Sequence, residues 1–455
     1  MSDRIIGIDL AVTAQHKAIV LDPARDEFIG RPISFRAYPA EMDKLLLRAR
    51  QGADEGVNLV AILEATGMAW YPVATYLERQ GVQVFRVNGQ KTKDFRQVLW
   101  KHTGSDQIDC RVLAKLYQVA RTRLSRCPLP NGELLALQRA CRIHAQWQVA
   151  DTAVQNRITA LDSWAWQGLH KLIPSEAKTW MRTDWYDAWQ VLAKGTDGLR
   201  EAWSEACGSA DEDSAWIAGW VERAQQMTEL YGSPDMAGYP ALQETMRSFV
   251  AEHQRYQQQM ALLFKEQINP LYTRLFPDCQ LTSIKGIGPQ SAAFYHSFIQ
   301  DIDRFPSVER FRKWCGLVPR SHQSGEAESK GLPLTKAGPN LVKATLYLNA
   351  EVARQWDVQV AFIYHQQMVR YGKHHLQAVC ACASHLANRI YAVLKQNRPY
   401  ELRDLHDQPI SAAQSRELCL FYHVPDEVRE RNNKRTCRQR AEQRSEGRWQ
   451  KRFAG

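Results

Sequence analysis

The first 125 residues alternate between short apolar runs and amphipathic stretches. Residues 4–9 and 59–64 are apolar runs that each end at an acid, a pattern typical of buried strands. Further strands are predicted at 17–21, 28–36 and 82–87, and helices at 40–51, 70–80 and 106–121. The predicted order is βββ-α-β-α-β-α, a three-strand meander that leads into parallel strands joined by crossover helices.

This order predicts an α/β N-terminal domain of the RuvC-like (RNase H-like) fold over residues 1–125. Strands one and four are neighbours in that fold, so the acids at their carboxyl ends, Asp9 and Glu64, should meet. The helix that follows Ser105, its predicted N-cap, should cross the same end of the sheet. It would present Asp106 and Asp109, which lie one helical turn apart.

A mainly α-helical middle region is expected over residues 130–275. Residues 133–161 and 246–264 carry apolar positions at helical spacing and are expected to pair as a helical hairpin or a coiled coil. Between them, residues 164–220 hold eight of the fourteen tryptophans. These rings either form the core of a small helical subdomain or stack on RNA bases, and the first interpretation is favoured.

A third, mainly α-helical block is predicted over residues 280–400, with a basic extension over 401–455. Near its start lies the run Ile284-Lys285-Gly286-Ile287-Gly288-Pro289, a glycine-rich turn before a predicted helix. It resembles the helix-hairpin-helix element of DNA-binding proteins, in which backbone N–H groups face a phosphate. Residues 315–325 predict a loop, and residues 339–397 predict further helices.

The charge of the chain is concentrated at one end. Of the net charge of +10, residues 429–455 contribute ten Lys or Arg against three Glu, a composition typical of nucleic-acid contact or of a solvated tail. No run approaches the ~18 apolar residues of a membrane span, and no leader peptide is indicated. Ten irregularly spaced cysteines argue against a disulfide framework. We therefore expect a cytoplasmic protein with no membrane contact.

The four acids Asp9, Glu64, Asp106 and Asp109 predict a metal-dependent site that acts on phosphodiesters. Each acid alone is more often a surface charge or a helix-start residue, but acids that converge can hold a pair of Mg2+ ions. One ion then polarises the scissile phosphate while the other stabilises the leaving oxygen. Sugar kinases also carry an acid after their first strand, but the phosphate-binding glycine that follows it there is missing here.

Ser324 is a second candidate, as a nucleophile toward a phosphate. It lies beside Gly325 in a loop flanked by Arg320 and Lys330, and bound cations would have to activate it. No Ser/His/Asp arrangement can be read from the sequence. Contacts to nucleic acid are expected from the glycine-rich turn, the serine loop, two lysines and the basic extension: Lys285, Gly286, Gly288, Arg320, Gln323, Lys336, Lys343, Arg435, Arg438 and Arg440.

Two ordered groups of motifs carry a family resemblance. The first group resembles the DEDD domain of the insertion-sequence-110 family of transposases, which includes the pilin-gene inversion recombinases: Gly7-Ile8-Asp9, Leu63-Glu64-Ala65-Thr66-Gly67, Val87-Asn88, Asp106 and Asp109. The second resembles the C-terminal domain of that family: Ile284–Gly288, Cys315–Pro319, Gln323-Ser324-Gly325 and Lys336-Ala337-Gly338. The resemblance covers residues 4–125 and 280–397, and the long middle region and the tail depart from it.

The resemblance implies an RNA-guided DNA transposase or recombinase of a bacterial insertion sequence. Its four acids would bind Mg2+, with two ions in each composite site, and Ser324 would form a transient phosphoserine link to DNA. A structured non-coding guide RNA, the bridge RNA, would pair with donor and target DNA. A homodimer would assemble into a tetramer whose active sites combine two protomers, in the cytoplasm and at the nucleoid.

Two other functions stay open. A DEDD nuclease or Holliday-junction resolvase would use water as its nucleophile and would leave Ser324 without a role. A nucleic-acid-binding protein without enzymatic activity would use only the basic tail and the helical arms, although the presence of all four acids argues against it.

Overall fold

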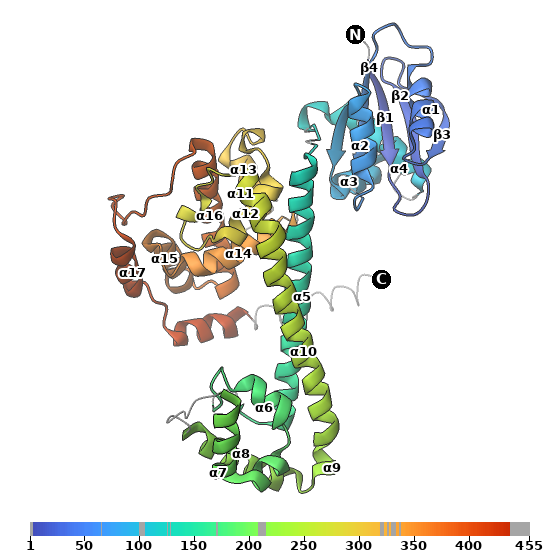
Figure 1. Ribbon diagram of the computed structural model, residues 1–455. Helices are drawn as coiled ribbons and strands as arrows, with labels where there is room; N and C mark the ends of the chain where they lie inside the picture. The colour runs from blue at the N-terminus through green and yellow to red at the C-terminus, as the bar shows by residue number, and fades with distance from the viewer. Residues whose placement is uncertain are drawn as a thin grey trace. The chain divides into compact units, whose positions relative to one another are not determined.

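The computed structural model describes residues 3–436, except 65, 100–104, 125, 128, 170–171, 208–214, 319–322, 325–326, 329–333 and 336–337. The chain forms two compact units, Met1–Asn131 and Gly132–Gly455. The first is an α/β unit and the second is mainly helical (Figure 1). The finer predicted division of the second unit, near residues 275–280 and 400–401, stays a prediction.

The first unit is built on a mixed five-stranded sheet of order β3-β2-β1-β4-β5. The strands are β1 (Asp3–Asp9), β2 (His16–Asp22), β3 (Glu27–Phe35), β4 (Asn58–Glu64) and β5 (Gln83–Val87). The helices are α1 (Pro39–Arg50), α2 (Trp70–Arg79), α3 (Gly89–Leu99) and α4 (Asp106–Ala120). Since β1 pairs in parallel with β4, the predicted adjacency of the first and fourth strands is confirmed.

Each face of this sheet carries its own core. On one face, Ile6 and neighbouring apolar side chains pack with residues of α1 and α2 such as Leu45 and Leu77. On the other face, Ile62 and its neighbours pack with α4 through Leu113. Because β1 and β4 are covered on both faces, their sequences are continuous apolar runs rather than alternating ones.

Helix α3 was not predicted from the sequence. Its residues are mostly polar, and among its described side chains only Thr92 is buried. Phe95 packs against the edge of the core that α4 shares with the sheet. The predicted element order therefore lacked one helix, between β5 and α4.

A close approach of α4 to β1 depends on Gly7. A Cβ at this residue would lie 2.0 Å from the Cys110 carbonyl oxygen and 2.7 Å from the Ala114 nitrogen, far inside van der Waals contact. Both atoms belong to the backbone of α4, so a rotamer change cannot relieve the clash. Glycine at this position therefore lets the first turns of α4 lie directly on β1.

In the second unit, α5 (Gly132–Ala165) packs along α10 (Tyr239–Leu263), so the predicted helical hairpin is confirmed (Figure 1). A buried carboxylate lies between the two helices. Asp151 is 3% exposed, and its oxygens lie 2.6 Å from His253 Nδ1 and accept a hydrogen bond from Gln257 Nε2 at 2.7 Å. Because a buried charge needs these partners, the contact favours one register of the hairpin.

The tryptophan-rich segment between the two helices forms its own core. It comprises α6 (Lys178–Asp184), α7 (Ala188–Cys207), α8 (Ala215–Tyr231) and α9 (Pro234–Ala237). Trp166, Trp203 and Trp220 are buried together with Met181 and Leu199. This confirms the interpretation of these rings as the core of a helical subdomain.

The rest of the second unit surrounds another core. Its helices are α11 (Asn269–Leu275), α12 (Pro289–Ile299), α13 (Val308–Cys315), α14 (Asn340–Ala353), α15 (Val358–His365), α16 (His375–Gln396) and α17 (Ala412–Phe421). Phe294, Leu346 and Leu386 are among its buried side chains. Among the residues described, no helix has both the length and the apolar composition to cross a membrane.

We expect Gly7→Ala to lower the free energy of unfolding of the first unit by at least about 2 kcal/mol, because the added methyl meets backbone atoms of α4. Gly132→Ala adds the same methyl at the first residue of the second unit and is the control, since a Cβ there meets no heavy atom within 4 Å and the first unit should unfold as in wild type. Urea unfolding of both variants measures the difference. Equal stability of the two would mean that α4 does not lie on β1 as closely as described.

Candidate active site

Two acids lie side by side at the carboxyl end of the sheet. Ile8 of β1 is in register with Leu63 of β4, and Asp9 and Glu64 are the next residues of the two parallel strands. Side chains alternate along a strand, so Glu64 points to the same face as Ile62, the face that α4 covers. Asp9 shares that face with Gly7, on which α4 rests.

The other two acids lie in the first turn of α4, at Asp106 and Asp109. Ser105 occupies the N-cap position with extended backbone, and its carbonyl oxygen accepts the Asp109 N–H at 2.9 Å. The predicted N-cap position of Ser105 is therefore confirmed, although its hydroxyl accepts no backbone N–H. Because α4 is held against β1 at Gly7, its first turn lies near the end of that strand.

The other three acids lie close enough to Asp9 to affect the pKa of its carboxyl group. The pKa of Asp9 is raised to about 7 by burial first and then by repulsion from Asp109, Asp106 and Glu64. Repulsion of this kind requires like charges a few ångströms away. The raised pKa of Asp9 therefore agrees with the predicted convergence of the four acids at one end of the sheet.

Helix α3 brings Arg96 and Gly89 next to the acids, and neither neighbour was predicted from the sequence. Arg96 Nη1 lies 3.0 Å and 3.1 Å from the two carboxylate oxygens of Asp109. Gly89, the first residue of α3, lies so close to Glu64 that a Cβ would be 2.4 Å from Glu64 Oε1. A basic residue ten positions before an acidic pair is a weak signal, and the contact of Arg96 with Asp109 could not be predicted without first predicting α3.

The donor set fits a hard divalent cation. All four side chains offer carboxylate oxygens, the ligands that Mg2+ prefers, and a cation would relieve the repulsion that raises the pKa of Asp9. Within the described part of the chain, no three His, Cys, Asp or Glu side chains are already spaced as ligands of one ion. Asp109 is instead paired with Arg96, whose guanidinium occupies the carboxylate.

Ser324 belongs to the second unit. It ends β6 (Gln323–Ser324), which pairs antiparallel with β7 (Ala327–Glu328) so that Ser324 is opposite Ala327. The side chains of Gln323 and Ser324 lie outside what the structure describes. The same is true of four predicted nucleic-acid contacts: Arg320, Lys336, Arg438 and Arg440.

The glycine-rich turn precedes α12, as predicted, and it packs on α14. Gly286 has a φ of 91°, and a Cβ there would lie 2.6 Å from the Asn349 carbonyl oxygen. The Gly286 carbonyl accepts a hydrogen bond from Asn349 Nδ2 at 2.7 Å. Gly288 is exposed at the N-cap of α12, and Lys285 is half-buried beside it.

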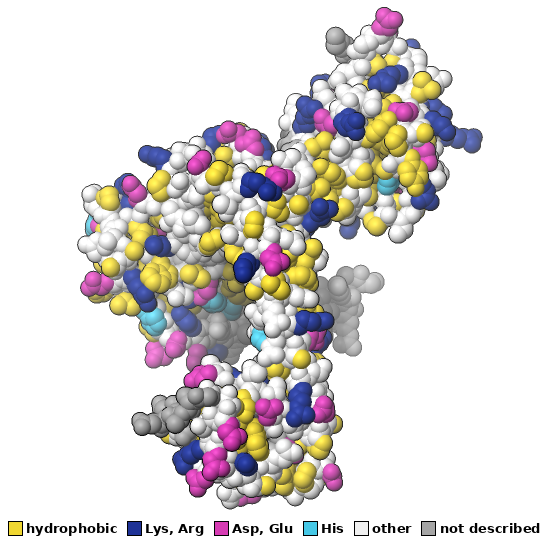
Figure 2. Space-filling model, in the orientation of Figure 1, with side chains coloured by type: hydrophobic (Ala, Val, Ile, Leu, Met, Phe, Trp, Pro, Cys, Tyr) yellow, Lys and Arg dark blue, Asp and Glu magenta, His cyan; other side chains and the backbone are white. Residues whose placement is uncertain are grey.

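The remaining predicted contacts lie on other elements. Lys343 is half-buried in the first turn of α14, and Arg435 is exposed in a helical segment at 426–436. Asn432 connects this segment to the π-helical turn Gln366–Arg370 and the loop after it, because its Nδ2 donates to the carbonyl oxygens of Met368 and Lys373. On the face in Figure 2, Lys and Arg are interspersed with Asp and Glu rather than gathered in one patch.

Two family profiles match the chain in the regions that hold these residues. A transposase profile for the DEDD proteins of the IS110 group matches residues 6–162. The profile of the IS116/IS110/IS902 transposase family matches residues 279–366. Together they cover just over half of the chain. The chain belongs to the IS110 family of transposases.

Individual relatives of this IS110-family chain are distant. The pilin gene-inverting protein of Moraxella lacunata is 28% identical over 123 residues, which cover 27% of this chain and 38% of that protein. The pilin gene-inverting protein of Moraxella bovis has the same identity and coverage. An insertion element IS110 protein of Streptomyces coelicolor is 28% identical over 123 residues, 30% of its length. The chain thus spans less than two fifths of these relatives.

The raised pKa of Asp9 predicts a pH-dependent stability in metal-free protein. Between the ordinary value of 3.8 and about 7, folded Asp9 holds a proton that the unfolded chain releases. The free energy of unfolding therefore falls as the pH rises from about 4, and the loss is complete above about pH 7. We expect Asp9→Asn in excess chelator to raise Tm by several degrees at pH 8 and much less at pH 5.

The control is Asp54→Asn, which neutralises an exposed acid of the same unit. It should leave Tm nearly unchanged at both pH values. A Tm difference between Asp9→Asn and wild type that does not grow with pH would contradict the electrostatic grouping of the four acids.

Proposed function

We propose that this chain is an RNA-guided DNA transposase or recombinase that cuts and rejoins DNA strands through Mg2+ and a serine nucleophile. The observation that carries the proposal is the electrostatic convergence of Asp9 with Glu64, Asp106 and Asp109 at one end of the sheet. The strand order supports a RuvC-like, RNase H-like fold for this unit. Membership of the IS110 family supports DNA as the substrate.

In this proposal each acid has a defined task. Asp9 and Glu64, from neighbouring strands, hold one side of the metal site, and Asp106 and Asp109 hold the other from α4. When bound, the ions polarise the scissile phosphate and stabilise the leaving oxygen. The Arg96 side chain has to leave Asp109 before that carboxylate can serve as a ligand.

Ser324 supplies the nucleophile in the proposed reaction. Its Oγ forms a bond to phosphorus, the bond from phosphorus to the leaving DNA oxygen breaks, and the serine proton passes to solvent. Attack by the hydroxyl of a DNA end on the phosphoserine reverses these changes, so strands are joined without an external energy source. Support comes from its position within residues 279–366, the region that the IS116/IS110/IS902 profile matches.

The proposal includes a guide RNA and a homotetramer built from two dimers. The resemblance of the motifs to the insertion-sequence-110 family supports both. The pilin gene-inverting relatives support a reaction that rearranges DNA segments. The basic residues at 429–455 and at the glycine-rich turn would contact the phosphates of RNA or DNA, with an affinity that falls as salt rises.

A trapping assay tests this function. The protein is purified with the RNA transcribed beside its own gene and incubated with Mg2+ and labelled donor DNA. We expect a denaturation-resistant protein–DNA band in wild type, and none in Ser324→Ala because the nucleophile is gone. Asp9→Asn should also lose the band, because a neutral amide is a poor ligand for Mg2+.

Asp54→Asn serves as the control acid and should form the band as wild type does. Cleaved DNA without any adduct, unaffected by Ser324→Ala, would overturn the serine mechanism and would identify a metal-dependent nuclease or junction resolvase that uses water. Full activity of Asp9→Asn would overturn the assignment of the metal site.

A further inference from the structure

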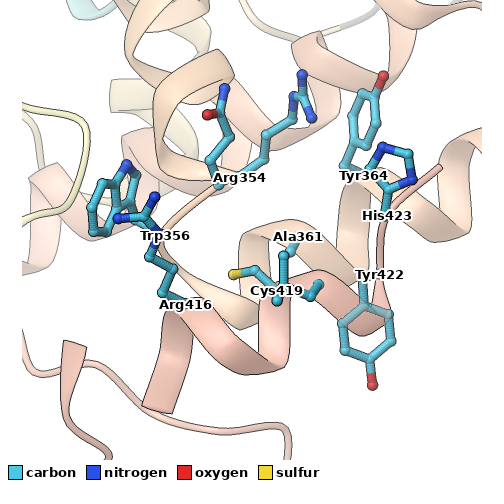
Figure 3. Close-up of a pocket in the computed structure, with 10 residues that line it drawn as sticks. Arg354, Trp356, Ala361, Tyr364, Arg416, Cys419, Tyr422 and His423 are labelled. Carbon is cyan, nitrogen blue, oxygen red and sulfur yellow. The ribbon is translucent and has the colours of Figure 1, made fainter. Parts of the chain in front are cut away.

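A cavity of about 240 Å³ lies in the second unit, between the end of α14, helix α15 and helix α17. Figure 3 shows Trp356 and Arg416 on one side of it and Tyr364 and His423 on the other, with Ala361 and Cys419 between them. The cavity is thus walled by aromatic rings and closed by small apolar groups. It is smaller than the usual drug-sized pocket of about 300–1,000 Å³, which restricts it to a ligand of the size of one ring system.

The lining is cationic and contains no carboxylate. Arg354, Arg416 and His423 line the cavity, and none of its other lining residues is acidic. The positive charge of Arg354 is offset by an ion pair with Glu351. Its buried Nε has no hydrogen-bond partner among the described residues. Arg416 is exposed, and within the described part of the chain no carboxylate pairs with it. The cavity therefore favours an anion.

Each of the two arginines lies over an aromatic ring. The Arg416 guanidinium is 4.2 Å from the centre of the Trp356 ring, and the Arg354 guanidinium is 4.4 Å from that of Tyr364. Tyr364 is buried, so only the pair of Trp356 and Arg416 is open to a ligand. A planar ligand can stack there, because rings and guanidinium planes both accept a nucleobase. A flat ring that carries a negative group fits this lining better than either a simple anion or an apolar molecule.

The wall that α17 contributes is firmly attached. Ser415 is fully buried, and its hydroxyl accepts the Val358 N–H at 3.1 Å and donates to the Trp356 carbonyl oxygen at 2.8 Å. A capping box of Ser411 and Gln414 begins the helix. Because α17 lies beyond residue 366, this wall is outside both regions that the family profiles match.

We propose that this cavity binds one unpaired nucleotide of a nucleic-acid strand, with the base beside the half-buried Trp356 ring and the phosphate at Arg416. The proposal rests on the proposed function in one respect, which is that the chain acts on nucleic acid. The residues that line the cavity belong to the second unit, whereas the four acids belong to the first. Unpaired RNA and unpaired DNA share the chemistry that the cavity recognises.

Site-specific photo-crosslinking of the full chain tests the proposal. The probes are a hexamer of RNA with a central 4-thiouridine and a hexamer of DNA with a central 4-thiothymidine. After irradiation and digestion, mass spectrometry locates the crosslinked residue. We expect crosslinks within 355–364 or 416–423, and a fall of about tenfold in their yield for Arg416→Gln, since a charge-assisted phosphate contact is lost.

Arg398→Gln is the matched control, because it removes an exposed guanidinium outside the cavity. His423→Gln, also exposed, is a second variant that should lower the same crosslinks. Crosslinks by the RNA or the DNA probe alone would support the proposal and identify the strand. Crosslinks only elsewhere, or equal losses in Arg416→Gln and Arg398→Gln, would overturn it.

The outcome is independent of DNA cleavage. A chain that forms no adduct with DNA but crosslinks in the cavity would refute the proposed transposase activity and support the nucleotide site. Adduct formation without crosslinks in the cavity would support the proposed transposase activity and refute the nucleotide site.

Discussion

The contact between Gly7 and the backbone of α4 positions the acids of the first unit. A helix that packs on a sheet is normally held off by side chains from both elements, but here a Cβ would be only 2.0 Å from a helix carbonyl. The first turn of α4 is thereby brought to the end of β1. Two acids from strands and two from a helix then fall within electrostatic reach of one another.

This arrangement works against the stability of the metal-free fold. Burial and three neighbouring carboxylates raise the pKa of Asp9 to about 7, so the ionised form of Asp9 is disfavoured in the fold. Arg96 offsets part of the negative charge of the site by pairing with Asp109. Carboxylates that repel one another in this way are typical of functional sites, because a bound cation attracts all of them and relieves the repulsion.

Much of the first unit was predictable because its signals are local. Apolar runs that end at Asp9 and Glu64 marked two strands, and the element order then fixed their adjacency. The tryptophan-rich core and the α5–α10 hairpin were also predictable, since their patterns follow helical spacing. Helix α3 was missed because it is mostly polar and buries little.

Contacts between segments far apart in the chain could not be predicted from the sequence. Arg96 beside Asp109 depends on how α3 and α4 pack, and no spacing rule gives that pairing. The cavity of the second unit joins Trp356 to Arg416, sixty residues further along the chain, through the buried hydroxyl of Ser415. A serine in a polar helix carries no sign of such a role until the fold is known.

Metal binding by the four acids is the central claim, and Mn2+ binding followed by electron paramagnetic resonance tests it most directly. Mn2+ is a hard cation that accepts the same oxygen ligands as Mg2+. Wild-type protein should bind Mn2+ in competition with Mg2+, and Glu64→Gln should weaken the binding by at least about tenfold, while Asp54→Asn should not. Equal Mn2+ affinity in wild type and Glu64→Gln would contradict the account.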